Sequence, residues 1–305
     1  MLIPVLCLAV FIFAAKPWTP DPIYQGRRAS EWLDDVAIGN NRYPEARKAI
    51  RALGSRAAPQ IIRFLRDRDS DAKRKLFGLL SKQSVVPVHF VPSDRRHRAA
   101  YECLPLAGTG ALTQAVPVLE ERLQDPDVRD SKVAAALLVR AGTNGLPVLI
   151  RNLANRNAFV RKHAILGLLS FQRPMNFDDV PEVLYDIWYV PSKSDRNRLA
   201  AHYREASLEP LIRCLTDPDP TVCCWAQYGL GIYHECPARV VPALMRNLGR
   251  AEISVRAGAA TALAEFGPSA KAAVPALKAA AKNDDDIVKL TAARALNLID
   301  SPEGR

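Results

Sequence analysis

The stretch ISVRAGAATALAEFGPSAKAAVPALKAAAKNDDDIVKLTAARALNLI, residues 253–299, contains one phrase twice. In each copy a valine is followed by a basic residue, by Ala at the fourth and seventh positions, and by Leu at the eighth. Positions at these offsets lie on one face of a helix. A chain that repeats such a face predicts helices that pack against copies of themselves.

A second signal extends the repeat along most of the chain, with a period of about 30 residues. Short Val-Pro-like turns precede apolar helical segments such as AVPVLEERL and VVPALMRNL. A proline at this place predicts the first turn of a helix, where no N–H partner is lost. VVPVHFVP, with Pro87, predicts a degenerate or disordered copy. The other prolines are Pro59, Pro117, Pro147, Pro181, Pro210, Pro242 and Pro275.

A first helix is predicted ahead of each of these second helices, and a valine marks its start. The intervals between the markers are 32, 62, 33 and 33 residues, for Val128, Val160, Val222, Val255 and Val288. Three positions earlier stand the predicted N-caps, Asp125, Asn157, Asp219, Glu252 and Asp285, of which all but the glutamate are favourable. Gly142 and Gly267 predict left-handed helix ends.

Each unit is therefore a helix, a short turn and a second helix, and neither helix can bury its apolar stripe alone. Stacking of neighbouring units buries these stripes, and small residues at the fourth and seventh positions allow close approach. An all-α chain with a continuous layered core follows. The low aromatic content of 7% is typical of such packed helices.

The period, the D-x-x-V-[RK] start and the Ala-Ala-x-Ala-Leu middle resemble the HEAT repeat, in the bilin-lyase-like subgroup common in bacteria. The resemblance covers residues 41–300 and implies an α-solenoid of about eight helix pairs, a right-handed superhelix. It also implies a non-enzymatic scaffold that binds another protein. A bilin-lyase-type enzyme is a third reading, after a nucleic-acid-binding module.

The N-terminus carries an apolar run of 14 residues, LIPVLCLAVFIFAA, at residues 2–15. This is the length of a signal-peptide core and is short for a membrane span. Residues 1–22 are expected to be a signal peptide or an N-terminal anchor with a Pro-rich spacer, which predicts a protein of the cell envelope. A buried helix in a cytoplasmic protein is the alternative. Residues 301–305 are expected to form a tail.

The phrase YQGRRASEWLDDV lies in residues 23–40, between the apolar run and the first repeat. Its Tyr24, Gly26, Arg27 and Trp32 resemble the Y-x-G-[KR]-x-x-x-x-W opening of exported or membrane-anchored bacterial HEAT proteins. We expect an N-terminal cap in which Trp32 and Leu33 cover the end of the first helix pair. The alternative is an aromatic that binds a ligand.

The net charge of +10 is concentrated at one end of the chain. Residues 1–100 hold 18 Lys and Arg against 9 Asp and Glu, whereas residues 206–305 are balanced. This argues against a long nucleic-acid groove and favours one local contact with an anionic membrane or, as the alternative, nucleic acid. A solvated face is the plainer reading. The candidate basic patch is Lys73, Arg74, Lys75, Arg95, Arg96 and Arg98.

Sequence motifs of common enzymes are absent, including GxSxG, HExxH, Walker and GxGxxG patterns. Among enzymes built on HEAT repeats, deoxyhypusine hydroxylase needs several His-Glu pairs to hold iron, and only His234-Glu235 occurs here. We therefore expect no catalytic residues and no cofactor.

Four cysteines cluster near His234, but adjacent cysteines point to different faces of a helix and do not have the spacing of a zinc site. Buried core residues are the favoured reading, with a disulfide as the alternative. The residues are Cys214, Cys223, Cys224 and Cys236, and Cys103 would remain unpaired. His89, His97, His163 and His202 are scattered and are expected to be surface or satisfied interior residues.

The second helices carry arginines at one equivalent position, opposite the apolar stripe. The HEAT resemblance implies that second helices line the concave surface, so these arginines would form a row that grips an acidic partner through bidentate contacts. Ordinary solvated arginines are the alternative. The row is Arg63, Arg151, Arg213 and Arg246, interrupted by Glu121, Tyr185 and Ala279.

Overall fold

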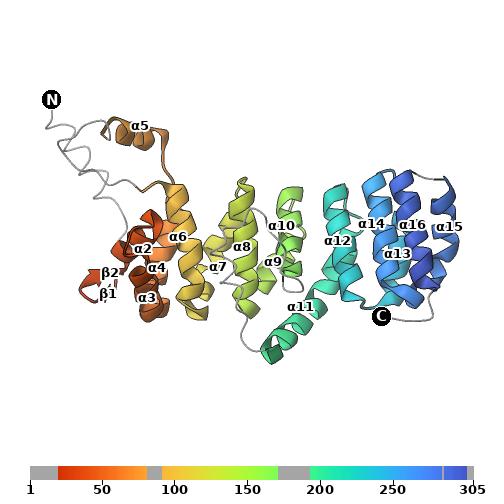
Figure 1. Ribbon diagram of the computed structural model, residues 1–305, viewed down its shortest axis with the longest axis horizontal. Coiled ribbons are helices and arrows are strands. Elements are labelled where there is room, and N and C mark those ends of the chain that lie inside the picture. The colour runs from red at the N-terminus through yellow and green to blue at the C-terminus, as the bar shows by residue number, and fades with distance from the viewer. Residues whose placement is uncertain (1–19, 81–90, 171–192, 284, 301–305) are drawn as a thin grey trace. The chain divides into compact units, whose positions relative to one another are not determined.

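The computed structural model describes residues 20–80, 91–170, 193–283 and 285–300. The chain forms two compact units, residues 1–115 and residues 116–305. Helices dominate both units in the described ranges (Figure 1). The apolar run at residues 2–15 and the predicted features at Pro87, His89, Pro181 and Tyr185 lie outside the described residues.

Unit 1 begins with a two-stranded hairpin and continues as helices, with α6 packed against α2, α3 and α4. Its fully buried side chains include Leu33, Ile50, Leu65 and Leu104. The helix α7, Thr109–Leu123, crosses the boundary between the units. The other elements are β1 Ile23–Tyr24, β2 Arg27–Arg28, α2 Ala29–Ile38, α3 Tyr43–Leu53, η1 Gly54–Ala57, α4 Ala58–Arg66, α5 Asp71–Leu80 and α6 Ser93–Leu106.

The YQGR phrase forms the tight turn of the hairpin. Tyr24 pairs with Arg27 in the antiparallel ladder, so only Gln25 and Gly26 remain in the loop. Both have positive φ, at 50° and 75°. Two successive residues with positive φ are the mark of a type I′ turn, which suits the twist of a hairpin and favours glycine at its second position. The two residues between Tyr24 and Arg27 in the Y-x-G-[KR] phrase are therefore explained by the geometry of this turn.

The hairpin holds Trp32 in place on α2. The indole Nε1 donates a hydrogen bond to the carbonyl of Tyr24 at 3.2 Å, and the Arg27 guanidinium lies 4.1 Å from the centre of the ring. Arg27 also pairs with Asp35 at 2.6 Å. Trp32 is 6% exposed and Leu33 is fully buried. These contacts leave little of the ring open to a ligand, and the role of this segment as a cap stays a prediction.

Unit 2 consists of two layers of helices, the arrangement of an α-solenoid. The first helices contact each other in succession, α8 with α10, α10 with α12, α12 with α14, and α14 with α16. The second helices α9, α11, α13 and α15 form the other layer, and each packs on a neighbouring first helix (Figure 1). The predicted fold class is confirmed; the handedness of the superhelix stays a prediction. The bounds are α8 Val128–Arg140, η2 Gly142–Asn144, α9 Leu146–Asn152, α10 Ala158–Leu169, α11 Lys193–Cys214, α12 Pro220–Tyr233, α13 Pro237–Asn247, α14 Ile253–Glu265, η5 Gly267–Ala273, α15 Val274–Asn283 and α16 Asp286–Ile299.

Small residues bring the first helices close together, as their spacing predicted. A Cβ on Gly167 of α10 would lie 3.1 Å from Ala135 of α8. A Cβ on Gly229, the equivalent residue of α12, would lie 2.7 Å from the Leu169 side chain. A Cβ at either position would require its neighbours to move, because interiors are packed to crystal density. Glycine at these two positions therefore favours close packing of neighbouring units.

The predicted N-caps are confirmed for four of the five first helices. Asn157, Asp219 and Asp285 accept hydrogen bonds from the first turns of α10, α12 and α16, and Glu252 holds the N-cap position of α14 without a side-chain bond. The prediction of Asp125 for α8 was wrong, because Asp127 caps that helix.

Because the N-cap of α8 is Asp127, the register of this helix begins two residues later than predicted. The true register places Asp130 where the other first helices have their marker valine, and Val128 is 45% exposed. Asp125 instead accepts the N–H of Asp127 at 3.1 Å. Asn155 and Asp217 make the same contact ahead of α10 and α12. The sequence pattern D-x-D supports both assignments, and only the packed structure decides between them.

Three of the predicted helix-opening prolines behave as expected. Pro59, Pro147 and Pro275 lie in the first turns of α4, α9 and α15. The prediction was wrong for Pro117, Pro210 and Pro242, which lie inside α7, α11 and α13. Each interior proline removes one backbone hydrogen bond. Packing of these helices offsets that loss, and in α13 another proline, Pro237, occupies the first turn.

The interval between Val160 and Val222 is 62 residues, about twice the repeat, but no additional first helix lies between α10 and α12 among the described residues. These two helices contact each other directly, and α11 serves as the second helix next to them. The additional residues of this interval lie in the long helix α11 and in residues 171–192, outside the described part of the chain.

Candidate functional site

The arginines of the predicted row occupy the same place in their helices. Arg63, Arg151, Arg213 and Arg246 each lie in the last turn of a second helix, α4, α9, α11 and α13 respectively. A cation there is favourable because the carbonyl end of a helix is partially negative. Arg63 belongs to unit 1, and the other three belong to unit 2. Within unit 2 the row consists of Arg151, Arg213 and Arg246.

The residue after the arginine has a structural role in two of these helices. Asn152 is buried and donates hydrogen bonds to Glu120 at 3.0 Å and to the Val148 carbonyl at 2.9 Å. Asn247 is buried and donates to the Leu215 carbonyl at 3.0 Å. Each asparagine thus joins its helix to the preceding unit. This fixes the orientation of the last turn, on which the arginine lies.

Two ion pairs cross between neighbouring second helices on the same face. Arg151 NH2 contacts both carboxylate oxygens of Glu120 at 2.7 Å. Arg239 pairs with Glu209, which holds the pKa of that carboxyl below its ordinary value. Exposed pairs of this kind contribute little to stability. They do mean that Arg151 already has a carboxylate partner, which the sequence did not predict.

A surplus of positive charge remains on this face, which we call the basic face. Arg213 of α11 and Arg246 of α13 are exposed, and α15 adds the exposed Lys278 and Lys282. None of these four makes an ion pair with an acidic side chain in the described part of the chain, although Arg213 lies near enough to Glu209 to help lower the pKa of that carboxyl. The lysines were missed because Ala279 occupies the position equivalent to the arginines. The signal in the sequence was a pair of lysines three and seven residues after Pro275, positions that share one face of a helix.

The predicted basic patch of unit 1 is partly neutralised by aspartates. Lys73 contacts Asp69 at 2.8 Å, and Arg96 contacts both Asp69 at 2.9 Å and Asp67 at 3.2 Å. These partners lower the pKa of Asp69 despite its partial burial. The patch members that remain exposed are Lys75, Arg95 and Arg98; the side chain of Arg74 lies outside the described atoms.

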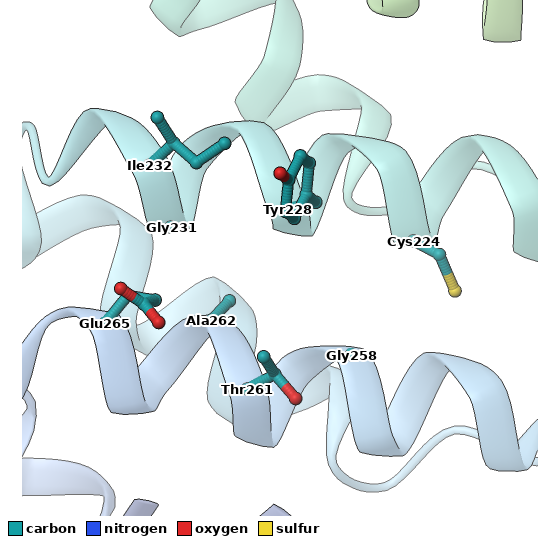
Figure 2. Close-up of a pocket in the computed structure, with 8 residues that line it drawn as sticks. All are labelled: Cys224, Tyr228, Gly231, Ile232, Gly258, Thr261, Ala262 and Glu265. Carbon is teal, nitrogen blue, oxygen red and sulfur yellow. The ribbon is translucent and has the colours of Figure 1, made fainter. Parts of the chain in front are cut away.

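A shallow hollow lies between α12 and α14 in the first-helix layer (Figure 2). Cys224, Tyr228 and Ile232 line it from α12, and Thr261 and Glu265 line it from α14. Its volume is about 190 Å³, below the roughly 300–1,000 Å³ of small-molecule pockets. The walls are mostly apolar, and Tyr228 is 40% exposed. The hollow has the size for one side chain of a partner rather than for a cofactor.

Two of the four clustered cysteines are core residues, and the prediction of burial was wrong for Cys236, which is exposed, while Cys224 is half-buried. Cys214 and Cys223 are buried, and Cys223 Sγ donates to the Leu215 carbonyl at 3.2 Å. Burial raises the pKa of Cys214 to about 11 and that of Cys223 to about 12. A thiol held neutral in this way is a poor nucleophile and metal ligand. Across the described ranges, the cysteines form no disulfide and no group of three metal-ligating side chains occurs.

The described histidines do not form a catalytic arrangement with the cysteines. His97 Nε2 contacts the Asp67 carbonyl at 2.8 Å, and His163 Nδ1 contacts the Phe159 carbonyl at 2.8 Å. His97 is therefore a satisfied interior residue as expected, whereas His163 is an interior residue with a hydrogen bond at Nδ1 and none at its buried Nε2. His202 is exposed. His234 lies 3.9 Å from Glu265 at the end of α12, where its backbone φ is 53°.

None of the described helices combines the length and the apolar character needed to cross a membrane.

The geometry thus defines a helix-pair repeat protein with an exposed basic face and a small apolar hollow. Residues 241–304 match the family model described as HEAT repeats. The matched segment covers the last helices of unit 2, including the repeated stretch from which the fold was predicted. The curated proteins contain no match to the chain.

Solved structures similar to the chain are also helical repeat proteins. One is an engineered protein, with 21% identity over 79% of this chain and 96% of that one, at a TM-score of 0.45. Another is a designed armadillo repeat protein in complex with the peptide (KR)4, with 15% identity over 80% and 99% of the chains and a TM-score of 0.43. A third is the complex of CpcE and CpcF of phycocyanin lyase from Nostoc sp. PCC7120, with 17% identity over 93% and 99% and a TM-score of 0.30.

Proposed function

We propose that this protein is a non-enzymatic scaffold that binds an extended acidic segment of another protein along the basic face of unit 2. One observation carries the proposal: exposed cations on three successive second helices, α11, α13 and α15, that make no ion pair with a carboxylate among the described residues. They are Arg213, Arg246, Lys278 and Lys282.

The spacing of these cations suits a chain of carboxylates rather than a single anion. Neighbouring helices in a layer lie about 8–10 Å apart, and a peptide in the polyproline II conformation advances about 3.1 Å per residue with three residues per turn, so that every third side chain lies on one face. A segment with an acidic side chain at every third residue would thus meet one helix after another. Arginine adds bidentate contacts to carboxylates, which fix the register of such a segment.

The N-terminal apolar run supports the second part of the proposal, that the scaffold is exported or anchored in the cell envelope. The partner is then a protein of the same compartment. A nucleic-acid module that uses the basic residues of unit 1 is the alternative, and Asp67 and Asp69 already neutralise part of that surface. A bilin-lyase activity has no supporting side-chain cluster among the described residues.

The test compares two variants of equal charge. In the first, Arg213, Arg246, Lys278 and Lys282 are all replaced by serine. In the control, four exposed arginines from elsewhere are replaced by serine: Arg95, Arg98, Arg129 and Arg156. The probes are a fluorescent peptide with glutamate at every third residue and a fluorescent single-stranded oligonucleotide, followed by fluorescence anisotropy.

We expect the basic-face variant to bind the peptide at least tenfold more weakly than the wild type, and the control to lose far less. Binding that falls equally in both variants would reflect net charge alone and contradict the proposal. Strong oligonucleotide binding that is lost only in the control would favour the nucleic-acid alternative, because Arg95 and Arg98 belong to that surface.

A further inference from the structure

The last helix of unit 2 carries an apolar face that nothing in the described part of the chain covers. Leu290 of α16 is 73% exposed and Ile287 is 61% exposed, the two highest values among the large apolar side chains apart from Ile23. Ala293 and Asn297, which lie on the same side of the helix, are also exposed. Exposure of two large apolar side chains one turn apart makes this face a candidate contact surface.

In the preceding repeat, the equivalent face of the first helix α14 is buried. One repeat of 33 residues earlier, the positions of Leu290, Ala293 and Asn297 are occupied by Ala257, Ala260 and Ala264 of α14. Those alanines are 9%, 0% and 6% exposed, because α14 is packed between α12 and α16. The exposed face of α16 is therefore in the position of a face that is buried against the next helix.

The composition of this face differs from that of the equivalent face of α14. Here the two large apolar residues stand where α14 has Ser254 and Ala257. The change from small to large side chains, at positions that face outward, favours contact with a partner surface.

Charges on the same face indicate which partner fits. Asp286 and Arg294 are both exposed and lie four residues before and four residues after Leu290. The side chain of Asp286 is 96% exposed, with only a contact to Lys289 at 3.2 Å. Arg294 has no acidic partner among the described residues. Opposite charges at equal distances from a central leucine are self-complementary in an antiparallel arrangement.

We propose that α16 is a homodimerisation helix, which pairs antiparallel with α16 of a second copy about a two-fold axis at Leu290. In this arrangement Leu290 meets Leu290 of the other copy, and Ile287 meets Ala293. Asp286 faces Arg294, and the pair occurs twice because a two-fold interface is isologous. This inference does not depend on what the basic face binds.

The small area that two α16 helices can bury limits the affinity of the dimer. A helix of 14 residues is about 21 Å long, so one helix pair buries less than the roughly 1,200 Å² of a standard stable interface. The dimer is therefore weak and reversible, with a dissociation constant on the order of 10–100 µM.

The experiment is sedimentation equilibrium of the full chain in density-matched detergent, across concentrations that span this range. We expect a monomer–dimer equilibrium for the wild type and a monomer for Leu290→Asp. The matched control is Ile23→Asp, which changes an equally exposed isoleucine of unit 1 and should leave the equilibrium unchanged. Far-UV circular dichroism checks that α16 remains helical in each variant.

A charge exchange tests the antiparallel register. Asp286→Arg and Arg294→Asp each place like charges opposite each other twice, so each should weaken the dimer about tenfold. The double variant restores opposite charges and should recover the wild-type constant. A wild-type chain that stays monomeric throughout, a dimer that survives Leu290→Asp, or a double variant that fails to recover would each overturn the proposal.

Discussion

His163 is a fully buried histidine on α10, and only one of its two ring nitrogens has a hydrogen-bond partner among the described residues. Its Nδ1 must donate the hydrogen bond to the Phe159 carbonyl, since a carbonyl only accepts, and Nε2 has no partner among the described residues. Burial lowers the pKa of His163 to about 4. The ring is therefore neutral at pH 7, and a proton on Nε2 would have no acceptor.

This histidine should make the protein sensitive to acid. Its folded pKa lies below the unfolded value of about 6.5, so the unfolded state takes up the proton more readily and gains stability as the pH falls from 6.5 to 4. We expect His163→Leu to reduce the loss of unfolding free energy between pH 7 and pH 4 by about 3 kcal/mol. Urea denaturation at both pH values measures this.

The exposed histidine of α11 provides the control. His202→Gln removes an exposed ring and serves as the comparison variant for the loss of a histidine. If His163→Leu shows the same acid sensitivity as the wild type, then the ring takes up its proton as readily in the folded protein as in the unfolded chain, and burial does not lower its pKa.

At the scale of elements, the turns between units are held by arginines at the start of first helices. Arg161 of α10 donates to Asp217 from Nε at 2.8 Å and from NH2 at 2.6 Å. Its NH1 donates to the Asn155 carbonyl at 2.9 Å. In α14, Arg256 binds the carbonyls of its own turn, Arg250 and Ala251. The basic residue of the D-x-x-V-[RK] phrase is thus a clamp on the turn.

Removal of one clamp should destabilise unit 2. The side chains of Arg161 and Asp217 are 11% and 8% exposed, so Arg161→Ala leaves a nearly buried carboxylate without its main partner. We expect a drop of several degrees in the thermal unfolding midpoint. Asp217→Ala should cost a similar amount, and the double variant should cost less than the two together, since they share one interaction.

Arg239→Ala is the matched control for this clamp. It breaks a bidentate pair with Glu209 between α11 and α13, but those side chains are 57% and 47% exposed. Its midpoint should stay close to the wild type. Equal losses for Arg161→Ala and Arg239→Ala would mean that burial does not decide the contribution of these pairs.

Local patterns predicted the elements of unit 2 more reliably than their boundaries. The offsets of valine, alanine and leucine identified the buried faces of α12, α14 and α16, because these faces recur at a fixed period. The start of α8 was misplaced because Asp125 and Asp127 both suit a cap. Pro117 and Pro242 were assigned to helix starts, although packing against neighbouring helices lets each helix begin earlier. Prolines and N-cap residues are local sequence signals, and they carry no information about such tertiary contacts.

At the scale of the whole molecule, the candidate site could be predicted only in part. The arginines of the row were visible as equivalent positions, but their ion pairs were not, because Glu120 and Arg151 are 31 residues apart. The lysines of α15 fall at different offsets and join the same face only after folding. The hollow between α12 and α14 and the open face of α16 also arise from packing. Sequence periodicity thus defines a solenoid better than it defines a surface.

We expect the apolar run at residues 2–15 to determine the compartment in which a partner is met. We expect the full chain with a C-terminal tag, expressed in a bacterium, to enter the envelope fraction, and the chain that begins at residue 20 to stay in the cytoplasm. The run is long enough for a signal-peptide core or an uncleaved anchor. Fractionation followed by mass spectrometry of the N-terminal residue distinguishes these two fates.

Each result of this fractionation changes what the basic face can bind. An intact Met1 in the membrane fraction, with the tag cleaved by added protease, would hold unit 2 outside the cytoplasm, where chromosomal DNA is absent. A new N-terminus near residue 15 would mean a released scaffold, free to form the α16 dimer without restriction to a membrane plane. A full chain that stays cytoplasmic with Met1 intact would contradict export, and the exposed arginines of unit 1 would then have access to nucleic acid.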